Sequence, residues 1–253
     1  MESQHRLQFS LGTFLFPLFF VFVMWLFFWI EVRFNYNLNF LGVYPQTMEG
    51  LLGVFFSPFV HSSLEHLFNN SVPLLVLMTA LFYFYRHIKW RVLLFGLVAT
   101  GFLTWSIARP AYHIGASGIV YMLASFLFFK GIFSKNFQLI ALSLVVVFLY
   151  GSLLWYLFPI DEKISWEGHL SGFIVGVVFS FLFRKNIVEN KKYEWEKENY
   201  DPSLDPFMQQ FDEEGNFIEK PKEEEIESVP EVPKKTKIKI LYTFKKKSKD
   251  EEL

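Results

Sequence analysis

Apolar residues along this chain fall in long runs, without the strict alternation of a half-buried strand. Six runs can be drawn as membrane segments, at about 14–30, 64–85, 92–107, 115–129, 137–158 and 166–183. A helix needs about 20 apolar residues to cross the roughly 30 Å hydrocarbon layer. The pattern therefore predicts an all-α polytopic membrane protein whose residues 1–185 form a bundle of six transmembrane helices.

The connection between the first two runs, residues 31–63, is too hydrophobic for a free loop. Its apolar stretches at 41–45 and 51–56 predict a segment that lies in the membrane interface on its apolar face. Such a segment could be a gate on the substrate side or simply an amphipathic lid.

Composition supports the membrane class and separates a tail from it. The chain is 52% hydrophobic, with 33 Phe and no Cys, so disulfides and thiol chemistry are excluded. Residues 1–184 carry 10 Lys/Arg and 7 Asp/Glu, whereas 185–253 carry 14 Lys and 18 Asp/Glu. We expect residues 186–253 to be a charged, largely disordered tail. Its basic stretch at 234–249 could contact anionic lipid.

Positive residues in the short connections predict the orientation. They gather after the second, fourth and sixth segments and are sparse in the alternate connections. Both termini and the tail are therefore expected to be cytoplasmic, and the compact core favours a bacterial cytoplasmic membrane. Segments two, four and six then all enter from the outer side.

Three polar motifs lie at or just before the starts of these three segments. They are the stretch from His61 through His66 to Asn70, the glycine-flanked Ser117, and His169 with glycines after it. From Gly115 to Lys130 is about 22 Å of helix, so Ser117 lies below the outer surface if Lys130 reaches the cytoplasmic interface. Polar side chains at that depth imply a water-filled cavity.

The chemistry of these residue types points to acyl transfer. A serine hydroxyl becomes a nucleophile when a base takes its proton, and histidine is the usual base. His169 shares a helix face with Gly172 and Gly176, and small residues allow close approach of the Ser117 helix. His66 and Asn70, one turn apart, could serve as oxyanion donors with the Ser117 backbone N–H. No Asp or Glu lies in the matching turns, so the pair is a dyad.

Each motif also has a simpler interpretation. The glycine-flanked serine could serve helix packing, His169 could cap its helix, and His66 with Asn70 could be a buried polar latch. Tyr121 could be a packing aromatic or could stack on His169. A metal site of His61, His66 and His169 is disfavoured, because no His-Glu-x-x-His helix or completing acidic residue is present. These simpler interpretations do not explain why all three motifs occur in this order and on the same side of the membrane.

The motifs resemble those of the rhomboid intramembrane serine proteases, over about residues 10–185. The resemblance implies Ser117 as nucleophile, His169 as general base, His66 and Asn70 as oxyanion donors, Tyr121 packed on the base and His61 lining the cavity. Gly115, Gly118, Gly172 and Gly176 would pack helices. It also implies an outward-open cavity in a six-helix core, cleavage of peptide bonds in or near transmembrane segments of other proteins, and no metal or cofactor.

One position departs from the family pattern. Many members carry a Trp-Arg pair where this chain has Leu52 and Gly53, which puts the architecture of this loop and the selection of substrates in doubt.

The expected partners are transmembrane protein substrates and the lipid bilayer, with no nucleic acid; the oligomeric state does not follow from the sequence. A non-catalytic membrane-protein-binding scaffold is the alternative function. A transporter is disfavoured, because no internal repeat is evident.

Overall fold

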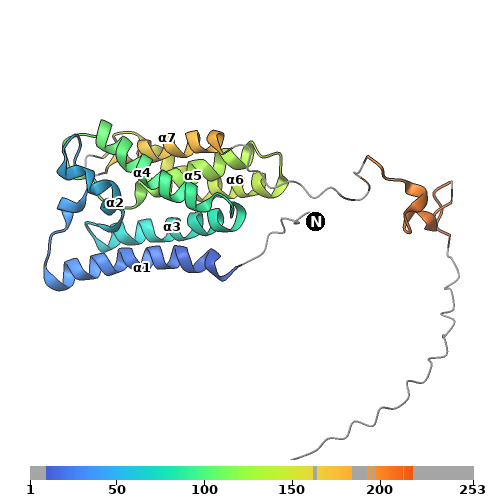
Figure 1. Cartoon of the computed structure of the whole chain (residues 1–253), viewed down its shortest axis with the longest axis horizontal. Helices are drawn as coiled ribbons and strands as arrows, with labels where there is room; N and C mark the ends of the chain where they lie inside the picture. Colours follow the sequence, from blue (N-terminus) through green and yellow to red (C-terminus); the bar gives the residue numbers. More distant parts are fainter. Residues whose placement is uncertain are drawn as a thin grey trace, which may run out of the picture. The chain divides into compact units, whose positions relative to one another are not determined.

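The computed structural model describes residues 10–161, 164–183, 193, 195, 198–212 and 214–218 of the chain. The chain divides into two units, Met1–Lys191 and Lys192–Leu253. The described part of the first unit is built from α-helices and short 3-10 helices, with a single isolated β-bridge and no named strand (Figure 1).

Each apolar run of the sequence contains one long helix. In chain order these helices are α1 (Leu11–Phe34), α3 (Leu64–Phe84), α4 (Lys89–Ile107), α5 (Ser117–Ile132), α6 (Phe137–Tyr150) and α7 (Trp166–Leu182). The fifth run is split, because α6 changes at Gly151 into the 3-10 helix η4 (Gly151–Leu157).

Four of these elements have the length and composition of membrane spans. They are α1, α3, α4 and α6 together with η4. Helices α5 and α7, which carry the predicted serine and histidine, are also apolar but have only 16 and 17 residues. Helix length and composition therefore support four membrane spans, and the number of six stays a prediction.

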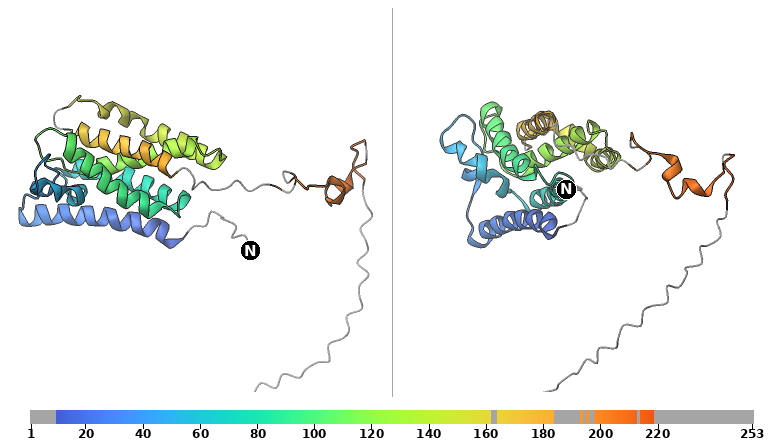
Figure 2. Two further views of the ribbon diagram at one scale, coloured as in Figure 1. Left: turned by 45° about the horizontal axis from the view of Figure 1, so that its top comes forward. Right: turned by 45° about the vertical axis from the view of Figure 1, so that its right-hand side comes forward.

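Helix α5 occupies the middle of the bundle and packs against α3, α4, α6 and α7, while α1 packs on α3 (Figure 2). Its side chains Met122, Leu123 and Phe126 are fully buried. In contrast, phenylalanines on the outside of α6 are highly exposed: Phe137 is 87% exposed and Phe148 is 86% exposed. A bilayer accommodates such exposed apolar side chains, so the excess of Phe is explained by the lipid-facing surface.

The connection from α1 to α3 is ordered by short helices and by backbone pairing. It contains η1 (Asn39–Leu41), η2 (Glu49–Leu51), α2 (Gly53–Phe56) and η3 (Ser57–Phe59). Val43 exchanges two backbone hydrogen bonds with His113, at 2.9 and 2.8 Å, and Gly115 N–H donates to Ser57 O at 2.8 Å. The connection is thus tied to the loop that leads into α5. Its exposed apolar side chains, such as Met48 at 78%, fit an interfacial position.

The expected depth of Ser117 supposed that Lys130, near the end of α5, reaches the cytoplasmic interface. Its side chain is 1% exposed, and its ammonium donates to the carbonyl of Phe183, just after α7. A charged donor here satisfies a carbonyl that the end of a helix leaves without an internal partner. Lys130 therefore joins the ends of α5 and α7 instead of reaching out to an interface.

The described part of the second unit consists of short turns. It contains η6 (Pro202–Leu204), η7 (Met208–Gln210) and an antiparallel bridge between Phe211 and Phe217. The carboxylate of Asp201 accepts from the backbone N–H of Ser203 at 2.9 Å, as in an Asx-turn. The rest of the predicted disordered tail, including the basic stretch at 234–249, lies outside the described residues.

Candidate active site

Ser117 and His169 meet across the contact between α5 and α7. Ser117 is the first residue of α5, and its Oγ lies 2.9 Å from Nε2 of His169, in the first turn of α7. The two residues are 52 positions apart in the sequence. This distance suits a hydrogen bond from the serine hydroxyl to an unprotonated ring nitrogen, the arrangement that general-base catalysis requires.

Two further contacts hold the imidazole of His169. Its Nδ1 lies 2.9 Å from the carbonyl oxygen of Tyr156, in η4. The ring of Tyr121 stacks on it with centroids 4.2 Å apart and planes 11° apart. The Tyr121 hydroxyl donates to the carbonyl of Leu153, also in η4, at 2.7 Å. The imidazole of His169 is therefore fixed on one edge and on one face.

The close approach of α5 and α7 depends on glycine. A Cβ added at Gly172 would overlap the carbonyl oxygen of Gly118, and one at Gly176 would overlap the carbonyl oxygen of Met122. These are backbone atoms that cannot turn away, so only glycine permits this helix separation. The face of small residues expected from the sequence is thus at the α5–α7 contact.

Gly115 has a different role, because it precedes α5. Its φ of +103° is one that L side chains rarely adopt. A Cβ at this position would lie 2.7 Å from Nε2 of His66 and 3.6 Å from Nδ2 of Asn70. Gly115 thus leaves room for both polar groups of α3 beside the backbone that leads into Ser117.

His66 and Asn70 are the two polar side chains of α3 that lie beside Gly115. Asn70 is buried, lines the cavity and donates one of its two side-chain N–H groups to the carbonyl of His66 at 3.0 Å. Nδ1 of His66 lies 3.3 Å from the Ser62 hydroxyl. When Ser62 donates this bond, Nε2 of His66 carries the hydrogen. Asn69 lines the same cavity but is exposed, whereas Asn70 is buried.

These groups surround a cavity of about 740 Å³. Ser117, His169, His66, Asn70 and Tyr121 all line it, so the structure brings five of the predicted residues around one space. Residues of η4 also line the cavity, as do Ser165 and Ile164 before α7. The volume is in the range of small-molecule sites in general and admits a few residues of an extended peptide.

His61 lies beside this cavity and is not among its lining residues. It is 2% exposed, and its ring meets the ring of His66 edge-on with centroids 5.0 Å apart. Burial lowers the pKa of His61 from 6.5 to about 4, with a further lowering from the neighbouring His66. A neutral His61 therefore packs edge-on against His66, whereas only His66 of the two lines the cavity.

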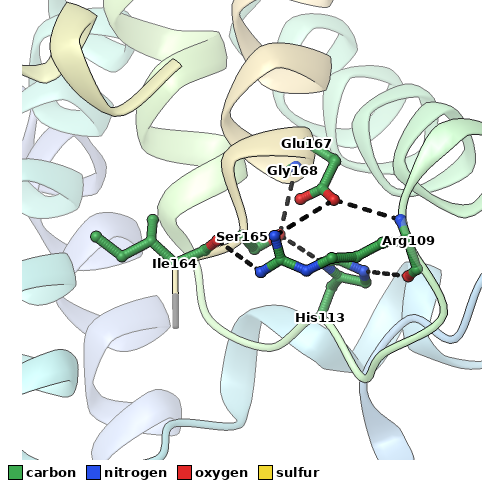
Figure 3. A network of polar contacts seen from close by, with 6 residues as sticks. All are labelled: Arg109, His113, Ile164, Ser165, Glu167 and Gly168. Carbon is green, nitrogen blue, oxygen red and sulfur yellow. Dashed lines mark hydrogen bonds and ion pairs between the residues drawn. The ribbon is translucent and has the colours of Figure 1, made fainter. Parts of the chain in front are cut away.

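A polar network that the sequence analysis missed joins the loop before α5 to the start of α7 (Figure 3). The guanidinium of Arg109 donates to the carbonyl of Ile164 at 3.0 Å and lies 3.7 Å from the carboxylate of Glu167. The same carboxylate oxygen accepts from the backbone N–H of Arg109 at 3.3 Å, and Glu167 is 2% exposed. The network connects the two chain segments that carry the serine and the histidine.

The second half of this network runs through His113 and Ser165 (Figure 3). Nδ1 of His113 lies 2.6 Å from the Ser165 hydroxyl, and its Nε2 lies 3.0 Å from the carbonyl of Arg109. Ser165 is the N-cap of α7 and accepts from the backbone N–H of Gly168 at 3.3 Å. A serine before an apolar helix with Glu two residues later was the available sequence signal for this cap.

Comparison with known proteins gives a family and several relatives. A family model described as Rhomboid domain matches residues 49–186. The uncharacterized protein Rv1337 of Mycobacterium tuberculosis and the uncharacterized protein Mb1372 of Mycobacterium bovis are each 36% identical over 152 residues, which is 56% of this chain and 62% of the relative. The uncharacterized protein ML1171 of Mycobacterium leprae is 32% identical over 195 residues, 72% of this chain and 75% of that protein. The match thus spans less than two thirds of the first two relatives.

Proposed function

Because the chain belongs to the rhomboid family, we propose that it is an intramembrane serine endopeptidase. In this proposal it hydrolyses peptide bonds in or near transmembrane segments of other membrane proteins. The observation that carries it is the 2.9 Å approach of Ser117 Oγ to His169 Nε2 inside a polar cavity of an otherwise apolar helical bundle.

The proposed reaction begins with proton transfer. Nε2 of His169 takes the hydroxyl proton as Ser117 Oγ attacks the carbonyl carbon of the scissile bond. The negative charge that forms on the carbonyl oxygen is met by N–H groups of His66, Asn70 and the Ser117 backbone. Nε2 then gives the proton to the departing amine, and water hydrolyses the acyl-enzyme by the same steps in reverse. No metal or cofactor takes part.

Support for the oxyanion assignment comes from the start of α5. The first N–H groups of a helix have no internal acceptor, so the Ser117 N–H is available to an anion. His66 and Asn70 approach the same backbone from α3, as the space at Gly115 indicates. In this proposal, three donors from two helices act on one side of Ser117.

The proposed topology follows from this chemistry. The protein is an integral membrane protein, and we propose that α5 and α7 complete six spans despite their shorter length. Their first turns lie at the cavity, where water instead of lipid meets the chain, so a shorter apolar stretch suffices. The proposal places both termini in the cytoplasm of a bacterial cell, residues 1–185 in the membrane and residues 186–253 as a cytoplasmic tail.

A fluorophosphonate probe tests the proposal without a known substrate. Purified protein in detergent should be labelled covalently, and Ser117→Ala and His169→Ala should abolish the labelling. Ser106→Ala is the matched control, because Ser106 lies at the end of α4 and its hydroxyl donates to the carbonyl of Phe102 in the same helix. Folded wild-type protein that resists both this probe and a smaller serine-directed inhibitor would contradict the proposal and favour a non-catalytic helix-binding scaffold.

A further inference from the structure

The 3-10 helix η4 supplies two backbone carbonyls to the histidine of the dyad. Tyr156 O lies 2.9 Å from Nδ1 of His169. Leu153 O accepts from the Tyr121 hydroxyl at 2.7 Å, and the Tyr121 ring stacks on His169. One seven-residue segment thus contacts the imidazole directly at one edge and indirectly at one face.

The contact with Tyr156 determines which ring nitrogen carries the hydrogen. A carbonyl oxygen can only accept, so a hydrogen bond at this distance requires a hydrogen on Nδ1. In the neutral ring Nε2 is then bare, and it can accept the proton of Ser117. The opposite tautomer would set Nδ1 against the carbonyl with two lone pairs facing each other, and Nε2 could not act as the base.

The change from α6 to η4 explains why the Tyr156 carbonyl is free to do this. The last carbonyls of a helix have no partner within it. Tyr156 is the second-last residue of η4, and the next residue after η4, Phe158, is extended and donates its N–H to Trp155. The carbonyl of Tyr156 is therefore left for a partner outside η4, and His169 is that partner.

Among the residues that the structure describes, no carboxylate hydrogen-bonds to Nδ1 of His169. Glu167, two residues before His169, is directed to Arg109, through the guanidinium and the backbone N–H. In a Ser-His-Asp triad the aspartate holds the imidazole in the correct tautomer and orientation. Here a neutral backbone group contacts the same ring nitrogen.

We propose that the backbone carbonyl of Tyr156 is the positioning group of the general base, with the Leu153 carbonyl acting through Tyr121. This inference rests on the proposed dyad function. During the reaction the Nδ1 hydrogen stays in place, while Nε2 takes the proton of Ser117 and later gives it to the leaving amine. Since Leu153 and Tyr156 also line the cavity, a peptide bound there contacts the segment that orients the base.

The first test is the ring tautomer of His169 by nitrogen-15 NMR of histidine-labelled protein in detergent at neutral pH. The chain has 6 His, so the His169 signals are assigned by their loss in His169→Gln. The expected result is a protonated Nδ1 and a bare Nε2. A ring protonated on Nε2 overturns the proposal, and this measurement needs no variant that alters η4.

The second test changes the carbonyl itself. Incorporating the α-hydroxy analogue of leucine at position 157 converts the Tyr156–Leu157 peptide bond to an ester, whose carbonyl is a weaker acceptor. The same analogue at position 153 is the matched control. Like the ester at 157 it removes one N–H of η4, but it weakens the Ser152 carbonyl, which contacts neither His169 nor Tyr121 in the described structure. We expect the ester at 157 to slow fluorophosphonate labelling about tenfold and to reduce the Nδ1–H population. The ester at 153 should leave both the labelling rate and the tautomer unchanged.

The outcomes separate this inference from the proposed function. Labelling of wild type with His169 in the Nε2–H form, or an ester at 157 that leaves rate and tautomer unchanged, overturns the positioning role and keeps the hydrolase. Absence of labelling overturns the hydrolase, whereas the tautomer spectrum still reports the carbonyl contact by itself. Tyr156→Leu, which retains the backbone carbonyl, should keep the Nδ1–H tautomer; its loss would assign the effect to the side chain and count against the proposal.

Discussion

Gly172→Ala offers a direct test of the requirement for close helix contact at the dyad. The new Cβ would overlap the carbonyl oxygen of Gly118, the residue that follows Ser117. Since this atom belongs to the backbone of α5, the strain cannot be relieved by a side-chain rotation. Helices α5 and α7 must move apart, and the contact between Ser117 and His169 lengthens with them.

The magnitude follows from two effects. Overpacking of a tight contact costs about 1–3 kcal/mol of stability. A displacement of about 1 Å in a reacting pair can cost about 100-fold in rate. We therefore expect folded Gly172→Ala protein to react with a fluorophosphonate about 100-fold more slowly than wild type, with a lower thermal midpoint.

The assay compares labelling rate and thermal unfolding on the same preparations in detergent. Gly12→Ala, in α1, is the matched control, because its Cβ would meet only the side chain of Phe16, at 3.2 Å and 3.5 Å. This variant should label at the wild-type rate. Folded Gly172→Ala protein that labels within about threefold of wild type would refute the reasoning, since a rate loss of this size is what the displacement predicts.

Three further predictions concern other parts of the site. Asn70→Ala, which removes one proposed oxyanion donor, should lower the labelling rate about 100-fold with little change in the thermal midpoint, and unchanged labelling would contradict that role. Arg109→Ala leaves the buried carboxylate of Glu167 without its cation and should lower stability by about 1–3 kcal/mol, whereas the double variant with Glu167→Gln should regain part of it; simple additivity in a double-mutant cycle would argue against the pair. The unfolded chain protonates His61 near pH 6.5 and the folded chain near pH 4, so the unfolded state binds more protons in between and stability falls as the pH falls through this window. His61→Gln should reduce that fall in thermal melts at pH 7 and pH 5, and an unchanged difference would contradict it.

The helices could be predicted closely because their signal is local. Helix α3 begins at Leu64 as expected and ends one residue before the predicted limit, and α7 begins at Trp166. Long apolar runs and the polar residues that interrupt them specify these limits without reference to other parts of the chain. The exception is the fifth run, where the change to η4 at Gly151 has no equally clear signal in hydropathy.

The candidate site could be listed from the sequence but not assembled from it. Spacing indicated that His66 and Asn70 share a face of α3, and orientation put the three motifs on one side of the membrane. That Ser117 Oγ lies 2.9 Å from His169 Nε2, and that His61 lies behind His66 and not along the cavity, depends on how the helices pack. The distance between side chains on two different helices is determined by how those helices pack, whereas sequence spacing describes positions within a single helix.

What the sequence alone indicates about this protein is the set of apolar helices, their order, and the residue types available to a dyad. These follow from hydropathy and from one-turn spacing, which act within about 20 consecutive residues. Only the packing of the chain decides that Tyr156 contacts His169 and that Arg109 contacts Glu167. Every residue has a backbone carbonyl and many residues are charged, so the sequence does not identify the partner of either group. Whether a carbonyl is free depends on where a helix ends, and whether a charge is paired depends on which segment folds beside it.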